Sequence, residues 1–172
     1  MLTPQAIVDR LTNRFGEKIL EAVADGLHPR VHVAGETWRE LATFLKTDPD
    51  LKFDWLASLG GMDYVASEQL AIVVDLWSTT HNHTFAVKVF TPRDQPNLPS
   101  VTDLWAAANW HEREAFDMVG LTFDGHPDFR RILLEDNWVG YPLRKDYVFP
   151  REVNGIPGSV ELDWQQKPAA KK

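Results

Sequence analysis

Residues 100–151, SVTDLWAAANWHEREAFDMVGLTFDGHPDFRRILLEDNWVGYPLRKDYVFPR, decide the fold. The first part of this stretch predicts a helix that begins at Ser100 and ends at Gly120. The Ser100 hydroxyl can accept a free N–H group at the start of a helix, and Asp103 places a negative charge at the positive end of the helix dipole. Gly120 is suited to the left-handed residue that commonly ends a helix.

One stripe of the predicted helix is apolar but contains a carboxylate. Its apolar side chains recur at helical spacing: Val101, Leu104, Trp105, Ala108, Ala115, Phe116 and Val119. Glu112 falls within this stripe, where a carboxylate would lose its hydration. We therefore expect Glu112 either to find a basic partner or to stay protonated, and we favour a structural ion pair over a solvated charge or acid–base catalysis.

The opposite face of the helix is mixed, and it includes an indole that is costly to leave in water. Its members are Ala106, Ala107, Trp110, Arg113, Glu114 and Asp117. Both faces of the helix therefore need partners, which indicates an assembly surface.

The segment from Phe123 to Pro150 predicts an extended, turn-rich arm. Its glycines and prolines break any regular period: Gly125, Pro127, Gly140 and Pro142. Basic and apolar side chains alternate along it, and arginine binds carboxylates with two N–H groups at once. The predicted ion pairs join an arginine of the arm to a carboxylate of the helix: Arg130, Arg131 or Arg144 to Glu112, Glu114 or Asp117.

Length and composition predict one domain, residues 1–150, with a tail at 151–172 that docks on a partner or is disordered. Hydrophobic residues make up 44% and charged residues 25%, which is typical of a soluble globular protein. The net charge of −7 argues against nucleic-acid binding.

Without cysteine, these 172 residues cannot hold disulfides or cysteine-ligated iron–sulfur clusters. We expect no signal peptide and no transmembrane helix, since no apolar run approaches the ~20 residues needed.

The rest of the chain predicts an α+β fold, with helices packed on a small, mostly antiparallel or mixed sheet and an extended C-terminal arm. The predicted elements, in chain order, are a helix from Thr3 to Gly16, a strand over Arg30–Val33, a helix from a capping box at Thr37–Glu40 to Thr47, a strand over Phe53–Leu59 leading into a turn at Gly60-Gly61, a hairpin of Leu70–Ser78 with Thr84–Phe90, and a loop over Thr91–Pro99.

Two clusters carry candidate chemistry. His81-Asn82-His83 could form a metal pair, but no third ligand accompanies it, so we favour a hairpin tip in water. In Asp124-Gly125-His126-Pro127-Asp128, His126 could serve a hydrolase with an aspartate. No nucleophile is placed to use His126, and we favour a tight turn. Gly60-Gly61 lacks the setting of a phosphate-binding loop. We therefore predict no catalytic, cofactor or metal site.

Three consecutive motifs carry a resemblance to a known family: EREAFDMVG at 112–120, FDGHPDFRRILL at 123–134 and GYPLRKDY at 140–147. Together they resemble the signature of the 30 kDa subunit of respiratory complex I. In bacteria this is the C subunit of the type I NADH:quinone oxidoreductase. The likeness is densest over residues 100–150. Residues 135–137 depart from it, because many members have a proline-bearing turn there, and so does Val148.

The resemblance implies a cofactor-free subunit in the hydrophilic arm of the complex, with FMN, iron–sulfur clusters, NADH and quinone held by other subunits. Its implied partners are the 49 kDa quinone-site subunit and the iron–sulfur subunits of the same complex. The complex couples electron transfer from NADH to quinone with proton translocation, and this chain would be peripheral, on the cytoplasmic side of the plasma membrane. Related subunits of membrane-bound hydrogenases and of photosynthetic plastoquinone-reducing complexes remain alternatives.

The resemblance also assigns interfacial or structural roles, and none in catalysis, to the following positions: Glu112, Arg113, Asp117, Gly125, His126, Pro127, Arg130, Arg131, Pro142, Leu143, Arg144, Lys145 and Asp146.

Overall fold

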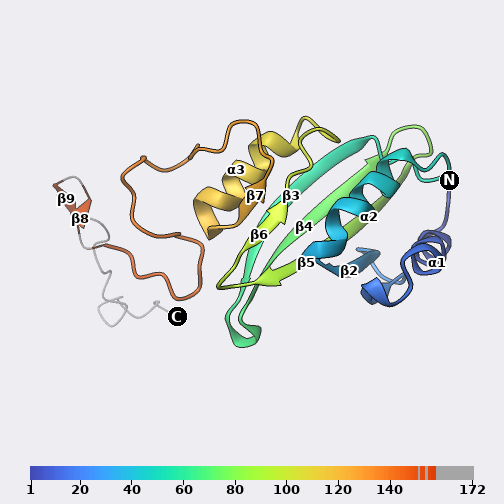
Figure 1. Ribbon diagram of the computed structural model, residues 1–172, viewed down its shortest axis with the longest axis horizontal. Helices are drawn as coiled ribbons and strands as arrows, with labels where there is room; N and C mark the ends of the chain where they lie inside the picture. Colours follow the sequence, from blue (N-terminus) through green and yellow to red (C-terminus); the bar gives the residue numbers. More distant parts are fainter. Residues whose placement is uncertain (151, 154, 158–172) are drawn as a thin grey trace, which may run out of the picture.

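The computed structural model describes residues 1–150, 152–153 and 155–157. A five-stranded sheet dominates it, with the order β1-β2-β5-β4-β3 (Figure 1). All neighbours pair antiparallel except β2 and β5, which are parallel. The strands are β1 (Ile19–Val23), β2 (Arg30–Ala34), β3 (Trp55–Tyr64), β4 (Gln69–Ser78) and β5 (His83–Pro92). The predicted α+β class with a mixed sheet is confirmed, although β1 was missed.

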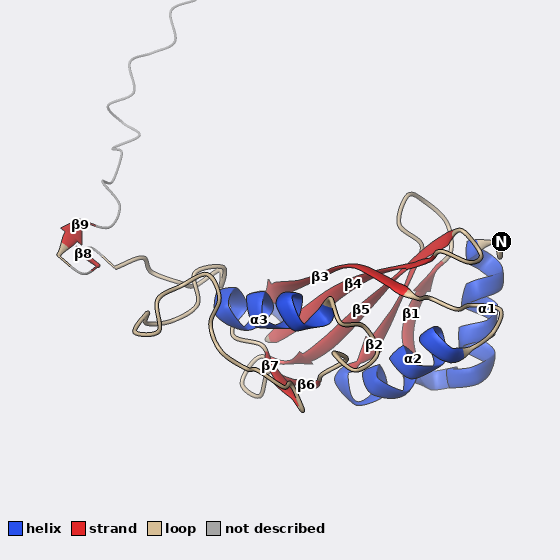
Figure 2. Cartoon of the chain, turned by 90° about the horizontal axis from the view of Figure 1, so that it is seen from above, coloured by secondary structure: helices blue, strands red, loops and turns tan. Residues whose placement is uncertain are grey.

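Helices α1 (Pro4–Phe15) and α2 (Gly35–Thr47) lie on one side of the sheet (Figure 2). Thr3 caps α1 as predicted, because its hydroxyl accepts a hydrogen bond from Ala6 N at 3.2 Å. Between the helices and the sheet lies the apolar core. Its largest fully buried side chains in this region are Ile7, Leu11, Trp38, Leu41, Leu45, Leu70, Ile72 and Leu76. Short 3₁₀ turns, η1 (Gly16–Lys18) and η2 (Val65–Ser67), connect elements.

The capping box predicted at Thr37 is wrong, because α2 begins two residues earlier. Ala34 is the N-cap, and no side chain caps the helix. The chain passes from β2 directly into α2 at Gly35, where an added Cβ would lie 2.7 Å from Leu98 Cδ2. Glycine at the first residue of the helix thus leaves room for the Leu98 side chain.

The turn predicted at Gly60-Gly61 is also wrong, since β3 runs through both glycines. An added Cβ at Gly61 would lie 3.0 Å from Val119 and 3.2 Å from Leu121. The missing side chain therefore allows the end of helix α3 to pack closely on the strand.

Helix α3 (Ala108–Val119) begins eight residues after the predicted N-cap. Ser100 does not cap it, because its hydroxyl donates to the Glu112 carboxylate at 2.7 Å. Asp103 instead accepts two 2.6 Å hydrogen bonds from Arg39. Residues 100–107 form turns ahead of the helix. The predicted C-terminal end is confirmed, because Gly120 is left-handed with φ +81°.

The hairpin of β4 and β5 is confirmed, but the expectation that both histidines of its tip lie in water is wrong. His83 is buried, its Nε2 lies 2.8 Å from the Leu51 carbonyl oxygen, and its Nδ1 accepts a hydrogen bond from Leu2 N. His81 stacks on the His83 ring. In the part of the chain that the structure describes, no group of three histidine, cysteine or acidic residues could hold a metal.

Two short strands, β6 (Asn97–Pro99) and β7 (Thr122–Asp124), pair in parallel on either side of α3 in the sequence, and both were missed. Residues 125–150 then form the predicted arm without helix or strand. Strands β8 (Glu152–Val153) and β9 (Ile156–Pro157) pair beyond it. The prediction for the tail at 151–172 falls mostly outside the described residues. Among those that are described, no helix is long and apolar enough to cross a bilayer.

Candidate assembly surface

Asp117 anchors the arm to α3. Its side chain is fully buried, and one carboxylate oxygen accepts hydrogen bonds from three consecutive backbone N–H groups at 2.7–3.1 Å, those of Ile132, Leu133 and Leu134. The other oxygen accepts from Arg131 Nη1 at 2.6 Å. Burial alone would raise the pKa of Asp117, but these donors hold it below its ordinary value. The predicted pairing of an arm arginine with a helix carboxylate is confirmed here.

Arg113 and Arg131 stabilise the backbone of the arm by donating hydrogen bonds to its carbonyl oxygens. Arg113 is almost fully buried, and its guanidinium donates to the carbonyl oxygens of Arg130 and Arg131 at 3.1 and 3.4 Å. Arg131 donates to the Trp138 carbonyl oxygen at 3.2 Å. Because an arm without helix or strand leaves many backbone groups unpaired, side chains supply the missing donors and acceptors.

Arg144 holds the arm at the end of α3. Its Nε donates to the Val119 carbonyl oxygen at 2.8 Å, and its guanidinium lies 4.9 Å from the centre of the Tyr141 ring. The Tyr141 ring lies against Gly120, where an added Cβ would be 2.5 Å from a ring carbon. Glycine is therefore needed at position 120 for its φ and for the space that the ring fills.

A second anchor lies at the end of β3. Asp63 is fully buried at its side chain and accepts from Arg93 Nε at 3.0 Å and from Lys145 N at 2.9 Å. The hydrogen bond from Arg93 holds the pKa of Asp63 below its ordinary value. Arg93 also bridges to Asp146 at 2.6 Å. Residues 145–146 are thereby tied to the sheet.

Glu112 joins α3 to the turns that precede it. It is fully buried and accepts hydrogen bonds from Ser100 Oγ and from Val101 N at 2.8 Å. Burial raises the pKa of Glu112 to about 7, which these two donors only partly offset. Among the described residues no arginine or lysine pairs with Glu112, and the basic group beside it is His126, whose Nε2 lies 4.0 Å away. The predicted pair with an arginine of the arm is therefore wrong for Glu112, and the protonated alternative fits.

The turn at His126 is confirmed. Gly125 is left-handed with φ +81°, and the fully buried His126 ring accepts a hydrogen bond from Asp128 N at Nδ1. Its Nε2 lies 3.2 Å from the Asn109 carbonyl oxygen and 4.0 Å from Glu112. With both ring nitrogens occupied and the ring shielded from solvent, the arrangement gives no support to a hydrolase.

Apolar side chains remain exposed on the outer side of the arm. They are Leu133, Val139, Leu143, Val148 and Phe149, with exposed fractions between 47% and 85%. Trp110 on α3 is 64% exposed and stacks with Arg113. Exposed apolar groups gathered on one segment are typical of a surface that another protein covers.

The structure gathers most of the predicted site residues around α3, ties Lys145 and Asp146 to the end of β3, and places the set at different depths. Buried side chains are those of Glu112, Arg113, Asp117 and His126, those of intermediate exposure are Arg131, Pro142 and Arg144, and the exposed residues are Gly125, Pro127, Arg130, Leu143, Lys145 and Asp146. Arg130 pairs with Asp128 on the arm itself and not with α3. Sequence reasoning missed Asp63 and Arg93, which no local pattern marks, and did not assign a role to Tyr141, although that residue lies in the motif at 140–147.

The model of the 30 kDa subunit of respiratory-chain NADH dehydrogenase matches residues 31–153, which is more than half of the chain. The chain belongs to this family. The match spans most of the sheet, α3 and the arm. The resemblance seen in the three sequence motifs is thus confirmed.

Relatives in this family are named as the C subunit of NADH-quinone oxidoreductase, and are thus parts of an oxidoreductase. The protein of Chloroherpeton thalassium is 42% identical over 85% of this chain and 61% of its own length. That of Chlorobium phaeobacteroides is 42% identical over 88% of this chain and 92% of its own. The chain thus spans about three fifths of the first relative and nearly all of the second.

Solved structures show the same fold. A trypsin-resistant fragment of Nqo5 superposes with a TM-score of 0.62 at 32% identity, covering 71% of this chain and 98% of the fragment. A chain of an archaeal membrane-bound sulfane sulfur reductase gives a TM-score of 0.65 at 22% identity over 84% of this chain and 85% of its own. The second likeness shows the fold alone.

Proposed function

We propose that this chain is a structural subunit of NADH:quinone oxidoreductase that holds neighbouring subunits together through residues 100–151 and carries no redox centre. The observation that supports this role most directly is the arm itself. Its backbone is fixed to α3 by buried polar groups, while several of its apolar side chains remain exposed, up to 85%. Such a segment gains stability when a partner covers its outer side.

In this proposal the partners are the 49 kDa quinone-site subunit and the iron–sulfur subunits of the complex, as the family resemblance implies. These other subunits hold FMN, the iron–sulfur clusters, NADH and quinone. The complex transfers electrons from NADH to quinone and couples the transfer to proton translocation. The chain would reach the membrane only through the complex, on its cytoplasmic side, with residues 1–150 as one domain and 151–172 docking on a partner.

The test is co-purification of a tagged chain from solubilised membranes of its native host. We expect larger iron–sulfur proteins and NADH:quinone reductase activity to accompany the tag, and no activity from the chain alone. Recovery of the chain by itself from membranes that contain the active complex would overturn the proposal, as would turnover by the isolated chain.

A matched pair of variants locates the contact on the arm. The double variant Val139→Asp and Val148→Asp should reduce recovery of partners by about tenfold or more, because it puts charges into an apolar contact. The control, Leu20→Asp and Leu27→Asp, changes apolar residues that are also exposed but lie on β1 and in the loop after it, at the opposite edge of the sheet from β3. Equal recovery with both double variants would contradict an arm-based interface.

A further inference from the structure

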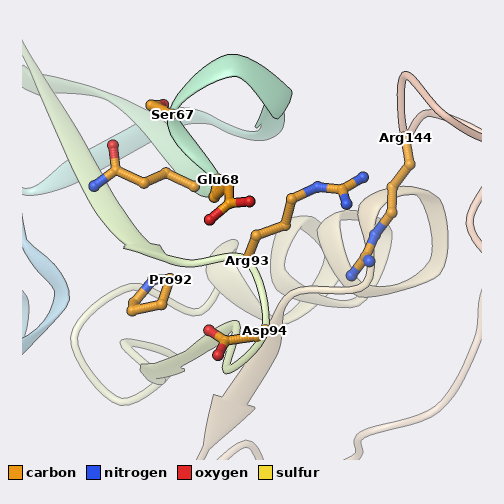
Figure 3. Close-up of a pocket in the computed structure, with 7 residues that line it drawn as sticks. Ser67, Glu68, Pro92, Arg93, Asp94 and Arg144 are labelled. Carbon is orange, nitrogen blue, oxygen red and sulfur yellow. The ribbon is translucent and has the colours of Figure 1, made fainter.

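A pocket of about 690 Å³ lies where the arm meets the turn before β4 and the loop after β5 (Figure 3). The residues that line it are Ser67, Glu68, Gln69, Pro92, Arg93, Asp94 and Arg144. Two of these are arginines, and Figure 3 shows both guanidinium groups on the same side of the pocket. They differ in their partners, and this difference shows what the pocket can bind.

Arg93 is already neutralised. It donates to both oxygens of Asp63 and to Asp146, at distances of 2.6–3.2 Å. Asp63 Oδ2 also accepts from Lys145 N, so both oxygens of this buried carboxylate are occupied. Neither carboxylate is hydrogen-bonded to a second guanidinium.

Arg144 is oriented but forms no ion pair with any described residue, although its charge acts on Asp63 from a distance and helps to lower the pKa of that carboxyl. Its Nε donates to the Val119 carbonyl oxygen, and the Tyr141 ring supports the flat face of its guanidinium. Among the described residues, no carboxylate forms an ion pair with Arg144 and no acceptor lies within hydrogen-bond distance of its two terminal amino groups. A guanidinium held in this way presents two parallel N–H donors, which match the two oxygens of a carboxylate.

The other walls of the pocket narrow the choice of ligand. Glu68 and Asp94 are exposed and negatively charged, and Figure 3 shows Glu68 beside Arg93 and Asp94 below it, both to the left of Arg144. A free phosphate with its higher charge would be repelled by these two carboxylates. A single carboxylate carries less negative charge than a phosphate, so these two groups repel it less while Arg144 attracts it.

We propose that Arg144 is the receptor for an aspartate or glutamate side chain of a neighbouring subunit, bound through both terminal amino groups. This inference rests on the proposed function and names the contact that one side of the arm makes. The competing interpretation is that Arg144 only caps the last turn of α3 through Val119. Lysine can keep the charge and the hydrogen bond to Val119 but cannot form the paired contact, so Arg144→Lys separates the two.

The first experiment uses Arg144→Lys in the complex purified from membranes and treats it with a carbodiimide, which joins an amine to a carboxylate that it touches. We expect mass spectrometry to find the new amine at position 144 joined to an acidic residue of a different subunit. The control, Arg130→Lys, should join only to Asp128 of the same chain, its present partner. An intact complex in which position 144 is joined to nothing, or only to Glu68 or Asp94, would overturn the inference.

The second experiment measures how much tagged chain enters the complex. Arg144→Lys should weaken partner binding by about tenfold and Arg144→Glu by about a hundredfold or more, because a reversed charge repels the partner carboxylate. The thermal unfolding of the isolated Arg144→Lys chain should match the parent. Assembly of both variants at the parent level would overturn the inference alone. Failure of the parent chain to co-purify with any subunit would overturn the proposed function and this inference together.

Discussion

The sheet-and-helix body, residues 1–124, and the arm, residues 125–150, are stabilised by different means. In the body, side chains such as Trp38, Leu41 and Ile72 are fully buried in one apolar core. Among the described residues, the buried apolar side chains end at Phe123, and none belongs to the arm. The hydrophobic effect thus explains the body more fully than the path of the arm, to which it contributes through the packing of Phe129 and Tyr141 against Phe116.

Polar groups of the body determine that path. Asp117 and Arg113 bind the backbone of residues 130–134. In the other direction, Arg144 of the arm donates a hydrogen bond to the Val119 carbonyl oxygen at the end of α3. Because only a few polar side chains hold the arm, the loss of one of them should destabilise the arm more than the loss of one apolar contact destabilises the core. The arrangement also leaves apolar side chains of the arm free for a partner. Four changes test the contrast, from the largest expected effect to the smallest.

Asp117→Ala should have the largest effect. It removes the acceptor of three backbone N–H groups and leaves Arg131 with a partly buried, unpaired charge, which costs about 3–5 kcal/mol. Hydrogen exchange at Leu133 N should become faster by at least about a hundredfold, while the amides of β4 and β5 stay protected. The matched control is Asp128→Ala, an exposed carboxylate of the arm. Unchanged exchange at Leu133 would show that apolar contacts hold the arm after all.

Glu112 should make the body less stable as pH rises. Its pKa is about 7 in the folded chain against an ordinary 4.5, so the folded chain binds more protons between these values. The stabilisation is fully present below pH 4.5 and is lost as pH rises through 7. Between about pH 5 and pH 8 this amounts to about 2–3 kcal/mol of unfolding free energy.

Glu112→Gln supplies the control for this pH effect. An amide can still accept from Val101 N and donate to Ser100 Oγ, but it does not titrate. Subtracting the denaturation curves of this variant from those of the parent removes the contributions of other groups, such as His83, whose pKa is lowered by burial. A difference that does not change with pH would show that Glu112 ionises normally in the folded chain.

Much of the body could be predicted from the sequence, because the spacing of apolar residues shows which face of a helix or strand is buried. Alternation over β4 and β5 and the 3.6-residue period of α1 follow from the apolar core. The errors occurred where one close contact overrode a local signal. Ser100 and Asp103 have the chemistry of a helix start, but they bond to Glu112 and Arg39 instead. Gly60-Gly61 looks like a turn, but Gly61 is small because α3 packs on it.

The arm was predictable in its residue types and not in its pairings. An excess of arginine opposite helix carboxylates indicated ion pairs, and Arg131 with Asp117 is one of them. Which arginine pairs with which acid depends on tertiary distances that sequence spacing does not contain. Asp63 is the clearest case, because it accepts a hydrogen bond from the backbone N–H of Lys145, which lies 82 residues away in the sequence.

Gly120→Ala tests how closely the arm packs on the end of α3. The left-handed φ costs alanine about 1–2 kcal/mol, and the new Cβ would also displace the Tyr141 ring that supports Arg144. Gly125→Ala is the control, since its φ is also +81° but nothing lies within 4 Å of an added Cβ. We expect Gly120→Ala to lower the thermal midpoint more than Gly125→Ala. Equal effects would mean that the ring can move aside freely.

Asp146→Asn should have the smallest effect, because its ion pair with Arg93 is exposed and Arg93 keeps its second, buried partner Asp63. Exchange at Lys145 N should accelerate by at most about fivefold, and the difference from the parent should vanish in about 1 M salt, which screens exposed charges. Asp63→Asn should accelerate it far more, since Lys145 N donates to that carboxylate. If Asp146→Asn instead released this end of the arm as strongly as Asp117→Ala releases its middle, exposed charges and not buried acceptors would determine the path of the arm.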